Sequence, residues 1–169
     1  MALYVVPGTV SAHGKAKAGD VVTMHVVLID LDHGDIACKR EHLVRHLGPP
    51  SLEVASGGVT VEGQHKLHLY WKLTGPAQGA GIATVCRLRG VIAAKVGGDP
   101  SFRSAHQPIR VAGSVYGKGG VRRLATIIAE NHTEFDLATL TEAVRVMPSL
   151  EGENESDSAH DDGSAPRVA

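Results

Sequence analysis

Short apolar runs alternate along the chain with longer amphipathic stretches, and these two patterns predict strands and helices respectively. Strands are expected where β-branched or alternating apolar residues cluster between turn-forming residues. The best defined runs are residues 3–6, 25–30, 51–55 and 67–73. The run at 25–30 ends in carboxylates, which is typical of a central strand whose end meets solvent. In the run at 67–73, alternation places His68, Tyr70 and Lys72 on one face.

Three stretches carry apolar residues at helical spacing, namely residues 37–47, 78–96 and 136–146. The first ends at Gly48-Pro49-Pro50 and the second at Gly97-Gly98, both of which break helices. The third begins at Asp136, a suitable N-cap, and stops before Pro148. Residues 121–130 are ambiguous in pattern and are predicted as a strand. The alternation predicts an α/β fold but does not decide how the strands are connected.

The length and a change of composition predict one folded domain, residues 1–148, followed by a tail, residues 149–169. The tail is rich in Ser, Gly and acidic residues, so we expect it to be disordered. It holds six of the 18 acidic and one of the 17 basic residues, which leaves 12 acids and 16 bases. The domain therefore carries about +4 rather than the −1 of the whole chain, a balance compatible with a polyanionic partner.

No segment has the pattern of a targeting signal or a membrane span. The first residues, MALYVVPGTV, lack a basic region followed by a long apolar stretch. No window approaches the uninterrupted apolar length that a spanning helix needs. We therefore expect a protein of the cytoplasm without a membrane partner.

The first candidate for chemistry is Asp30-Leu31-Asp32, at the end of the predicted strand 25–30. Alternate residues of a strand share a face, so both carboxylates could bind divalent cations as hard oxygen ligands. Taken alone, the pair is more readily explained as polar residues that end a strand and enter a turn.

A second candidate combines Ser56-Gly57-Gly58, expected to form a turn, with the following segment His65-Lys66-Leu67-His68. Imidazole and ammonium groups beside a glycine turn suit triphosphate oxygens, because both donate hydrogen bonds to anionic acceptors. The same residues would also fit the exposed face of an ordinary amphipathic strand.

A third candidate is Asp99, which follows the second predicted helix and precedes a glycine-rich, cationic stretch. Its carboxylate could complete a set of metal ligands, and the cations could contact phosphates or a template backbone. The polar residues of this stretch are Arg103, His106, Arg110, Ser114 and Lys118. Taken alone, the segment is better explained as a helix end followed by a solvated loop.

The order and spacing of these segments resemble the three motifs of the archaeo-eukaryotic primase (AEP) superfamily. The resemblance covers residues 3–148. In detail, the sequence resembles the primase-polymerase domains of plasmids, phages and mobile elements. Its parts, in order, are Leu3-Tyr-Val-Val-Pro7, Asp-Leu-Asp-His-Gly, Ser-Gly-Gly with His-Leu-Tyr-Trp, Gly-Asp-Pro, and Arg-x-x-Gly-Ser with a following Lys. It implies a two-layer α+β fold, with an RRM-like, mostly antiparallel sheet and flanking helices.

The resemblance also implies a catalytic set and a nucleotide-binding set of side chains. The catalytic set is Asp30, Asp32, Asp99 and His68, with the three carboxylates as ligands of Mg²⁺ or Mn²⁺. The nucleotide-binding set is Ser56, His68, Arg110 and Lys118. The implied activity is that of a DNA primase or polymerase, a nucleotidyltransferase with a two-metal mechanism, in replication of a plasmid, phage or mobile element. The implied partners are single-stranded DNA, nucleoside triphosphates and a replicative helicase or initiator in trans.

Two other classes of function stay open. The first is an HUH-type replication initiator or relaxase nuclease, in which His65, His68 and a carboxylate hold one metal and Tyr70 or Tyr116 attacks DNA. Against it, relaxases place their two histidines one residue apart, whereas these are three apart. The second is a truncated, catalytically inactive nucleic-acid-binding module. Covalent attachment to DNA would identify the nuclease, and metal-dependent nucleotide binding would separate the enzyme from the module.

Overall fold

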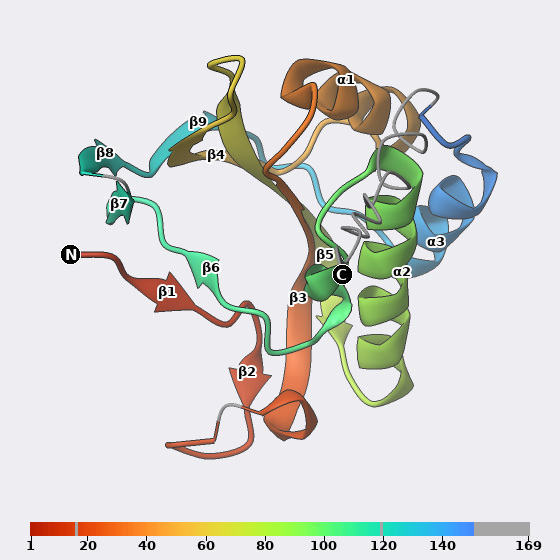
Figure 1. Ribbon diagram of the computed structural model, residues 1–169. Coiled ribbons are helices and arrows are strands. Elements are labelled where there is room, and N and C mark those ends of the chain that lie inside the picture. Colours follow the sequence, from red (N-terminus) through yellow and green to blue (C-terminus); the bar gives the residue numbers. More distant parts are fainter. Residues whose placement is uncertain (16, 119, 151–169) are drawn as a thin grey trace, which may run out of the picture.

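The computed structural model describes residues 1–15, 17–118 and 120–150 of the chain (Figure 1). The predicted tail lies outside the described residues apart from Ser149 and Leu150. The helices are α1 (Ile36–Leu47), α2 (Ala80–Val96) and α3 (Leu137–Val146), with the 3₁₀ helices η1 (Ala18–Asp20) and η2 (Pro100–Arg103). The strands are β1 (Tyr4–Val5), β2 (Thr9–Val10), β3 (Val21–Leu31), β4 (Leu52–Val59), β5 (His65–Ala77), β6 (Ile109–Arg110), β7 (Val115–Lys118), β8 (Val121–Leu124) and β9 (Thr126–Glu130).

The main sheet has the order β2-β3-β5-β4-β9, and each of its neighbouring pairs is antiparallel. β3 and β5 form its long centre, with 11 and 13 residues. Two small antiparallel pairs, β1-β6 and β7-β8, stand beside it. The predicted α+β class with a mostly antiparallel sheet is therefore confirmed.

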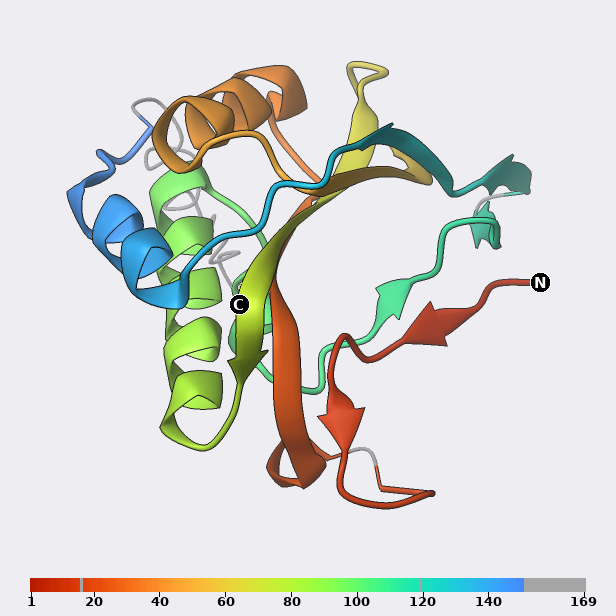
Figure 2. The ribbon, with the colours of Figure 1, turned by 180° about the vertical axis from the view of Figure 1, so that it is seen from behind.

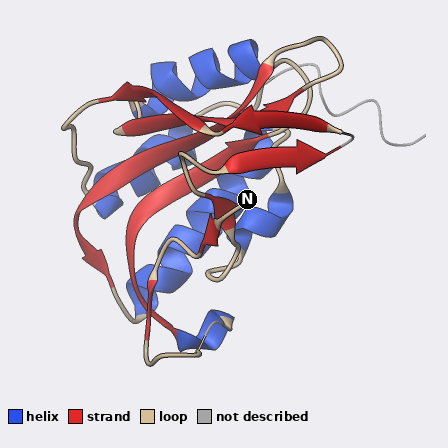
Figure 3. Cartoon of the chain, turned by 90° about the vertical axis from the view of Figure 1, so that its left-hand side faces the viewer, coloured by secondary structure: helices blue, strands red, loops and turns tan. Residues whose placement is uncertain are grey.

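The three α-helices lie on one side of the main sheet and form the second layer (Figures 2 and 3). β3 and β5 send alternate apolar side chains toward them, among which Ile29, Leu69 and Trp71 are at most 1% exposed. These side chains belong to one core with Val85 and Ile92 of α2. Burial of this apolar layer is the main favourable term that holds the strands in place. Within the described residues, no helix is long and apolar enough to cross a membrane.

The opposite face of the sheet is covered in part by a small apolar cluster. Phe102 of η2 and Ile109 of β6 pack there with Leu28, and Tyr70 lies against them. The small strand pairs stand on this side of the molecule (Figures 1 and 2). The face therefore has a second set of elements that can enclose polar side chains at the ends of β3 and β5.

The predicted helix ends are confirmed by their caps. Asp35 accepts a hydrogen bond from the backbone N–H of Cys38 at the start of α1, and Asp136 does the same for Thr139 at the start of α3. Gly97 ends α2 in the left-handed conformation, with φ of 61°.

The turn predicted at Ser56-Gly57-Gly58 is wrong, because these residues lie inside β4. The pairing register with β5 shifts between Ala55 and Val59, which marks an irregular, bulged stretch of strand. The chain reverses later, where the N–H of Thr60 donates to the carbonyl of Gln64 at 2.9 Å. Glycines in this strand therefore serve a purpose other than chain reversal.

The strand predicted at 121–130 is divided into two strands that join different sheets. β8 pairs with β7, whereas β9 forms the edge of the main sheet beside β4. The break falls at the buried Ala125, whose N–H donates to the carbonyl of Ser114 at 2.9 Å. The apolar pattern does not change across this residue, so only the tertiary contacts locate the break.

Candidate active site

A cavity of about 240 Å³ brings together residues from the three sequence motifs. Its lining comes from the ends of β3 and β5, from η2, and from the small strands β1, β6 and β7. The polar residues of the lining are Tyr4, Asp30, Asp32, Ser56, Lys66, His68, Asp99, Gln107, Arg110 and Tyr116. Carboxylates and cations therefore face the same space.

Asp30 and His68 are direct partners across the β3-β5 ladder. His68 Nε2 lies 3.7 Å from Asp30 Oδ1, and the two side chains are 5% and 18% exposed. Burial raises the pKa of Asp30 to about 7, with further contributions from the negative charges of Asp32 and Asp99. Burial lowers the pKa of His68 to about 4, and the charge of Arg110 lowers it further. At neutral pH the imidazole is therefore neutral, and its contact with Asp30 is not an ion pair.

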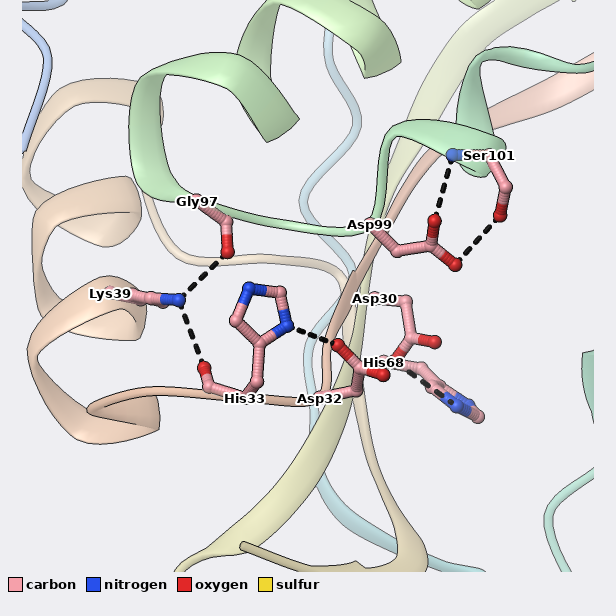
Figure 4. A network of polar contacts seen from close by, with 8 residues as sticks. All are labelled: Asp30, Asp32, His33, Lys39, His68, Gly97, Asp99 and Ser101. Carbon is pink, nitrogen blue, oxygen red and sulfur yellow. Dashed lines mark hydrogen bonds and ion pairs between the residues drawn. The ribbon is translucent and has the colours of Figure 1, made fainter. Parts of the chain in front are cut away.

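The other two carboxylates bond to neighbours in their own loops (Figure 4). Asp32 Oδ1 lies 2.6 Å from His33 Nδ1. Asp99 is the N-cap of η2 and accepts hydrogen bonds from the backbone N–H of Ser101 at 2.8 Å and from its hydroxyl at 2.7 Å. These bonds hold Asp32 and Asp99 in orientations that do not depend on Asp30.

The three carboxylates offer the hard oxygen ligands that Mg²⁺ and Mn²⁺ prefer. As they stand, no three His, Cys, Asp or Glu side chains of the described residues are grouped tightly enough to hold one ion. Burial is the main cause of the raised pKa of Asp30, and the negative charges of Asp32 and Asp99 add to it; a bound cation would offset that repulsion. The donor set therefore fits a divalent cation in kind, although it is not assembled around one.

Arg110 places a cation in the same cavity. Its guanidinium donates to the carbonyl of Ser56 at 2.9 Å and to the hydroxyl of Tyr4 at 2.7 Å. It also lies 5.2 Å from the ring centroid of Tyr4 and 4.8 Å from that of Tyr116. Its Nε is buried and has no hydrogen-bond partner among the described residues. The guanidinium is thus held in place by two hydrogen bonds and two aromatic rings, as a positive charge in the lining of the cavity.

Lys118, the last of the predicted nucleotide ligands, ends β7 and pairs through its backbone with Val121 of β8. Its side chain lies outside what the structure describes. Its contact with a nucleotide therefore stays a prediction from the sequence resemblance.

Three residues of the cavity are absent from the nucleotide-binding set that the resemblance implies, namely Lys66 of the second sequence candidate and the tyrosines Tyr4 and Tyr116. Lys66 precedes His68 by two residues on β5, so strand alternation alone could have placed both on one face. Tyr4 and Tyr116 come from distant segments and meet only around Arg110. No sequence pattern joins those two rings.

The two histidines considered for a nuclease point in opposite directions. His65 and His68 lie three residues apart on β5, so their side chains emerge on opposite faces of the strand. His65 is exposed, whereas His68 is buried against Asp30. The pair therefore does not converge on one metal position.

The antiparallel sheet and the helical layer on one face form an α+β fold similar to that of archaeo-eukaryotic primase domains, and the cavity lies at the ends of its central strands. Among solved structures, the AEP domain of the primase-polymerase of cyanophage S-2L is similar to the chain, with a TM-score of 0.66. The match covers 83% of this chain and 69% of that one, at 20% sequence identity. No protein-family model matches the chain, and no curated protein matches it significantly. The predicted fold is confirmed, and the residue roles stay predictions.

Proposed function

We propose that the chain is a template-directed nucleotidyltransferase, a DNA primase or polymerase that acts in replication of a plasmid, phage or mobile element. The observation that carries this proposal is the meeting of Asp30, Asp32 and Asp99 with His68 and Arg110 in one cavity. Carboxylates beside anion-binding groups are what a cation-assisted reaction of a nucleoside triphosphate requires. The AEP-type fold favours this reaction over other uses of the same residues.

Asp30, Asp32 and Asp99 would hold Mg²⁺ or Mn²⁺ in this proposal. When bound, the ions would lower the pKa of a 3′-hydroxyl and stabilise charge on the leaving pyrophosphate. The carboxylates contribute by facing one cavity from the end of β3 and from the start of η2, and the charges of Asp32 and Asp99 both raise the pKa of Asp30. Release of the Asp32–His33 and Asp99–Ser101 contacts would accompany binding.

His68 and Arg110 would position the triphosphate. Because the pKa of His68 is lowered to about 4, the imidazole stays neutral and can donate a hydrogen bond without adding charge. Its Nδ1 is buried and has no hydrogen-bond partner among the described residues. Arg110, held by Ser56 and two rings, supplies a fixed positive charge. This contribution is mainly orientation of the reacting phosphate.

The expected partners are single-stranded DNA and nucleoside triphosphates in the cytoplasm. A helicase or initiator in trans is a further expected partner, because primases act on strands that another protein has separated. Contacts to the template backbone would make binding strongly dependent on salt.

The test is incorporation of labelled nucleotides on single-stranded DNA with Mg²⁺ or Mn²⁺. We expect the variant Asp30→Asn/Asp32→Asn to lose all products, and His68→Ala to lose about 10²–10³-fold in rate. Asp20→Asn is the matched control, since this exposed carboxylate in η1 bonds only locally, to the N–H of Lys17. The control should retain the wild-type rate.

Other outcomes would favour the other classes. DNA binding by a folded wild-type protein that forms no products would favour an inactive binding module. Covalent attachment of the chain to DNA through a tyrosine would favour a nuclease. Products that persist in the double aspartate variant would refute the proposed site.

A further inference from the structure

The side chain of Lys39 joins the two loops that carry the candidate metal ligands (Figure 4). Lys39 lies in the first turn of α1 and is fully buried. Its Nζ donates to the carbonyl of His33 at 2.9 Å and to the carbonyl of Gly97 at 2.8 Å. His33 directly follows Asp32, and Gly97 precedes Asp99 by two residues. One buried ammonium group therefore bonds the backbone beside two of the three carboxylates.

The bond to Gly97 is favoured by the position of that carbonyl. Gly97 is the C-cap of α2, where the last carbonyls of a helix carry partial negative charge. A buried ammonium group is costly to leave without acceptors, so Lys39 keeps the end of α2 and the loop after β3 together. Removal of its donors would therefore weaken the connection between the two loops.

A close backbone contact joins the same loops from another direction. A Cβ on Gly98 would lie 3.5 Å from the carbonyl oxygen of Asp30 and 3.3 Å from Ala93 Cα. The turn after α2 thus packs directly against the end of β3. With this contact on one side and Lys39 on the other, the backbone that leads to Asp99 has little freedom relative to Asp30.

We propose that Lys39 is a positioning residue that sets the spacing between Asp32 and Asp99 and thereby the affinity of the site for a divalent cation. The role rests on the proposed function, because it presupposes that these carboxylates bind a cation. With the two loop backbones held, less of the backbone around Asp32 and Asp99 would have to be ordered on binding. Without Lys39, ordering of the loops would be added to the cost of binding.

The experiment is a titration of the full chain with Mn²⁺ alone, followed by electron paramagnetic resonance of the free ion. Lys39→Met keeps an unbranched side chain of similar size but removes the donors. We expect its Kd for Mn²⁺ to rise about 10-fold or more, as for residues that orient metal ligands in other proteins. In the incorporation assay, the Mn²⁺ concentration for half-maximal rate should rise in parallel. The rate at saturating Mn²⁺ should stay within a few-fold of wild type.

Lys95→Met is the matched control. The Lys95 ammonium comes from the last turn of α2 and donates to carbonyls at the end of α3, those of Val144 and Met147 among them. Lys95→Met therefore removes the same kind of contact as Lys39→Met. Lys95, however, joins α2 to α3 and not the two carboxylate loops. We expect this variant to lose thermal stability, as Lys39→Met does, and to keep the wild-type Kd for Mn²⁺.

The outcomes separate the two proposals. If wild type binds no Mn²⁺, or if Asp30→Asn/Asp32→Asn binds Mn²⁺ as tightly as wild type does, the proposed metal site is refuted. The role of Lys39 is then refuted with it. If wild type binds Mn²⁺ at these aspartates and Lys39→Met binds it with the same Kd, only the role of Lys39 is refuted. Should Lys39→Met not fold, Lys39→Gln replaces it. Its shorter amide can reach one carbonyl at most, and an unchanged Kd there would equally refute the role.

Discussion

Ionisation of the Asp30 carboxyl group lowers the stability of the folded protein, because this group is buried. It is largely buried beside His68 and near two further carboxylates, and its pKa is raised to about 7. The ordinary value for an aspartate is 3.8. The folded state therefore binds this proton more tightly than the unfolded state does.

This difference predicts how Asp30→Asn changes stability with pH when divalent cations are removed. As pH rises from about 4 to about 7, the wild-type folded state loses stability relative to the unfolded state, because the unfolded chain releases this proton whereas the folded protein retains it. The amide has no such cost, so the gain of the variant in free energy of unfolding should grow across this window and level off above pH 7. About 1.4 kcal/mol per pH unit is the upper limit of the slope. Urea denaturation of wild type and Asp30→Asn at pH 5, 6, 7 and 8 measures this difference in the free energy of unfolding.

His68 contributes a pH dependence of the opposite sign. Its pKa is lowered to about 4, so the folded state gains stability from this group as pH rises from about 4 to 6.5. Wild type and Asp30→Asn both contain His68. The difference between their free energies of unfolding therefore reports on the ionisation of Asp30. A difference in free energy that does not change with pH would contradict the raised pKa of Asp30.

At the scale of elements, the glycines of β4 allow the hairpin β7-β8 to approach closely. A Cβ on Gly57 would lie 2.7 Å from Tyr116 Cβ and 3.2 Å from the carbonyl oxygen of Arg123. Gly57 also has a φ of 85°, which favours glycine. The close approach brings Tyr116 to the cavity, where its ring lies near Arg110. Ser-Gly-Gly thus matters for packing between elements, whereas the sequence alone suggested a turn.

Gly57→Ala should therefore cost more stability than Gly63→Ala. Gly63 has nearly the same φ, 84°, but a Cβ there would meet nothing within 4 Å. The control should lose about 1 kcal/mol from the backbone conformation alone. Gly57→Ala should lose a further amount of about 1–3 kcal/mol from overpacking against the hairpin. Urea denaturation measures both losses. Equal decreases in the free energy of unfolding would contradict the prediction, because they would show that the hairpin β7-β8 shifts away from the added methyl group at no cost in stability.

For the whole molecule, the distribution of charge matters more than its sum. The net charge of −1 is the sum of about +4 for residues 1–148 and −5 for residues 149–169. The segment carries Glu151, Glu153, Glu155, Asp157, Asp161 and Asp162. These charges oppose the approach of a polyanion to the chain over distances comparable to the Debye length.

Replacement of these six acids by their amides should strengthen binding to single-stranded DNA. The change moves the net charge from −1 to +5, because all 17 basic residues then face 12 acids. We expect tighter binding than wild type at about 0.05 M salt and similar binding near 1 M, where screening acts within about 3 Å. Fluorescence anisotropy over this salt range measures it. A gain that persists at 1 M would show that the effect is not one of charge.

Much of the fold was accessible from the sequence because its signals are local. Helical spacing with caps at Asp136 and Gly97 located the helices, and β-branched runs located the centre of the sheet. The strand alternation around His68 also indicated which side chains share its face. Each of these features depends on neighbours a few residues away, so periodicity and capping chemistry suffice to find it.

The fine structure of the site depended on contacts between distant segments. The sequence by itself determined the ends of the helices at Gly48 and Gly97 and the centres of the buried strands, since these follow from backbone geometry and apolar burial, while the set of carboxylates came from the resemblance of its motifs to a known family. Only the tertiary structure decided that Ala125 separates two sheets, that Tyr4 and Tyr116 enclose Arg110, and that Lys39 joins two loops. The reason is physical, because a hydrogen bond or close contact between remote residues leaves no period in the sequence.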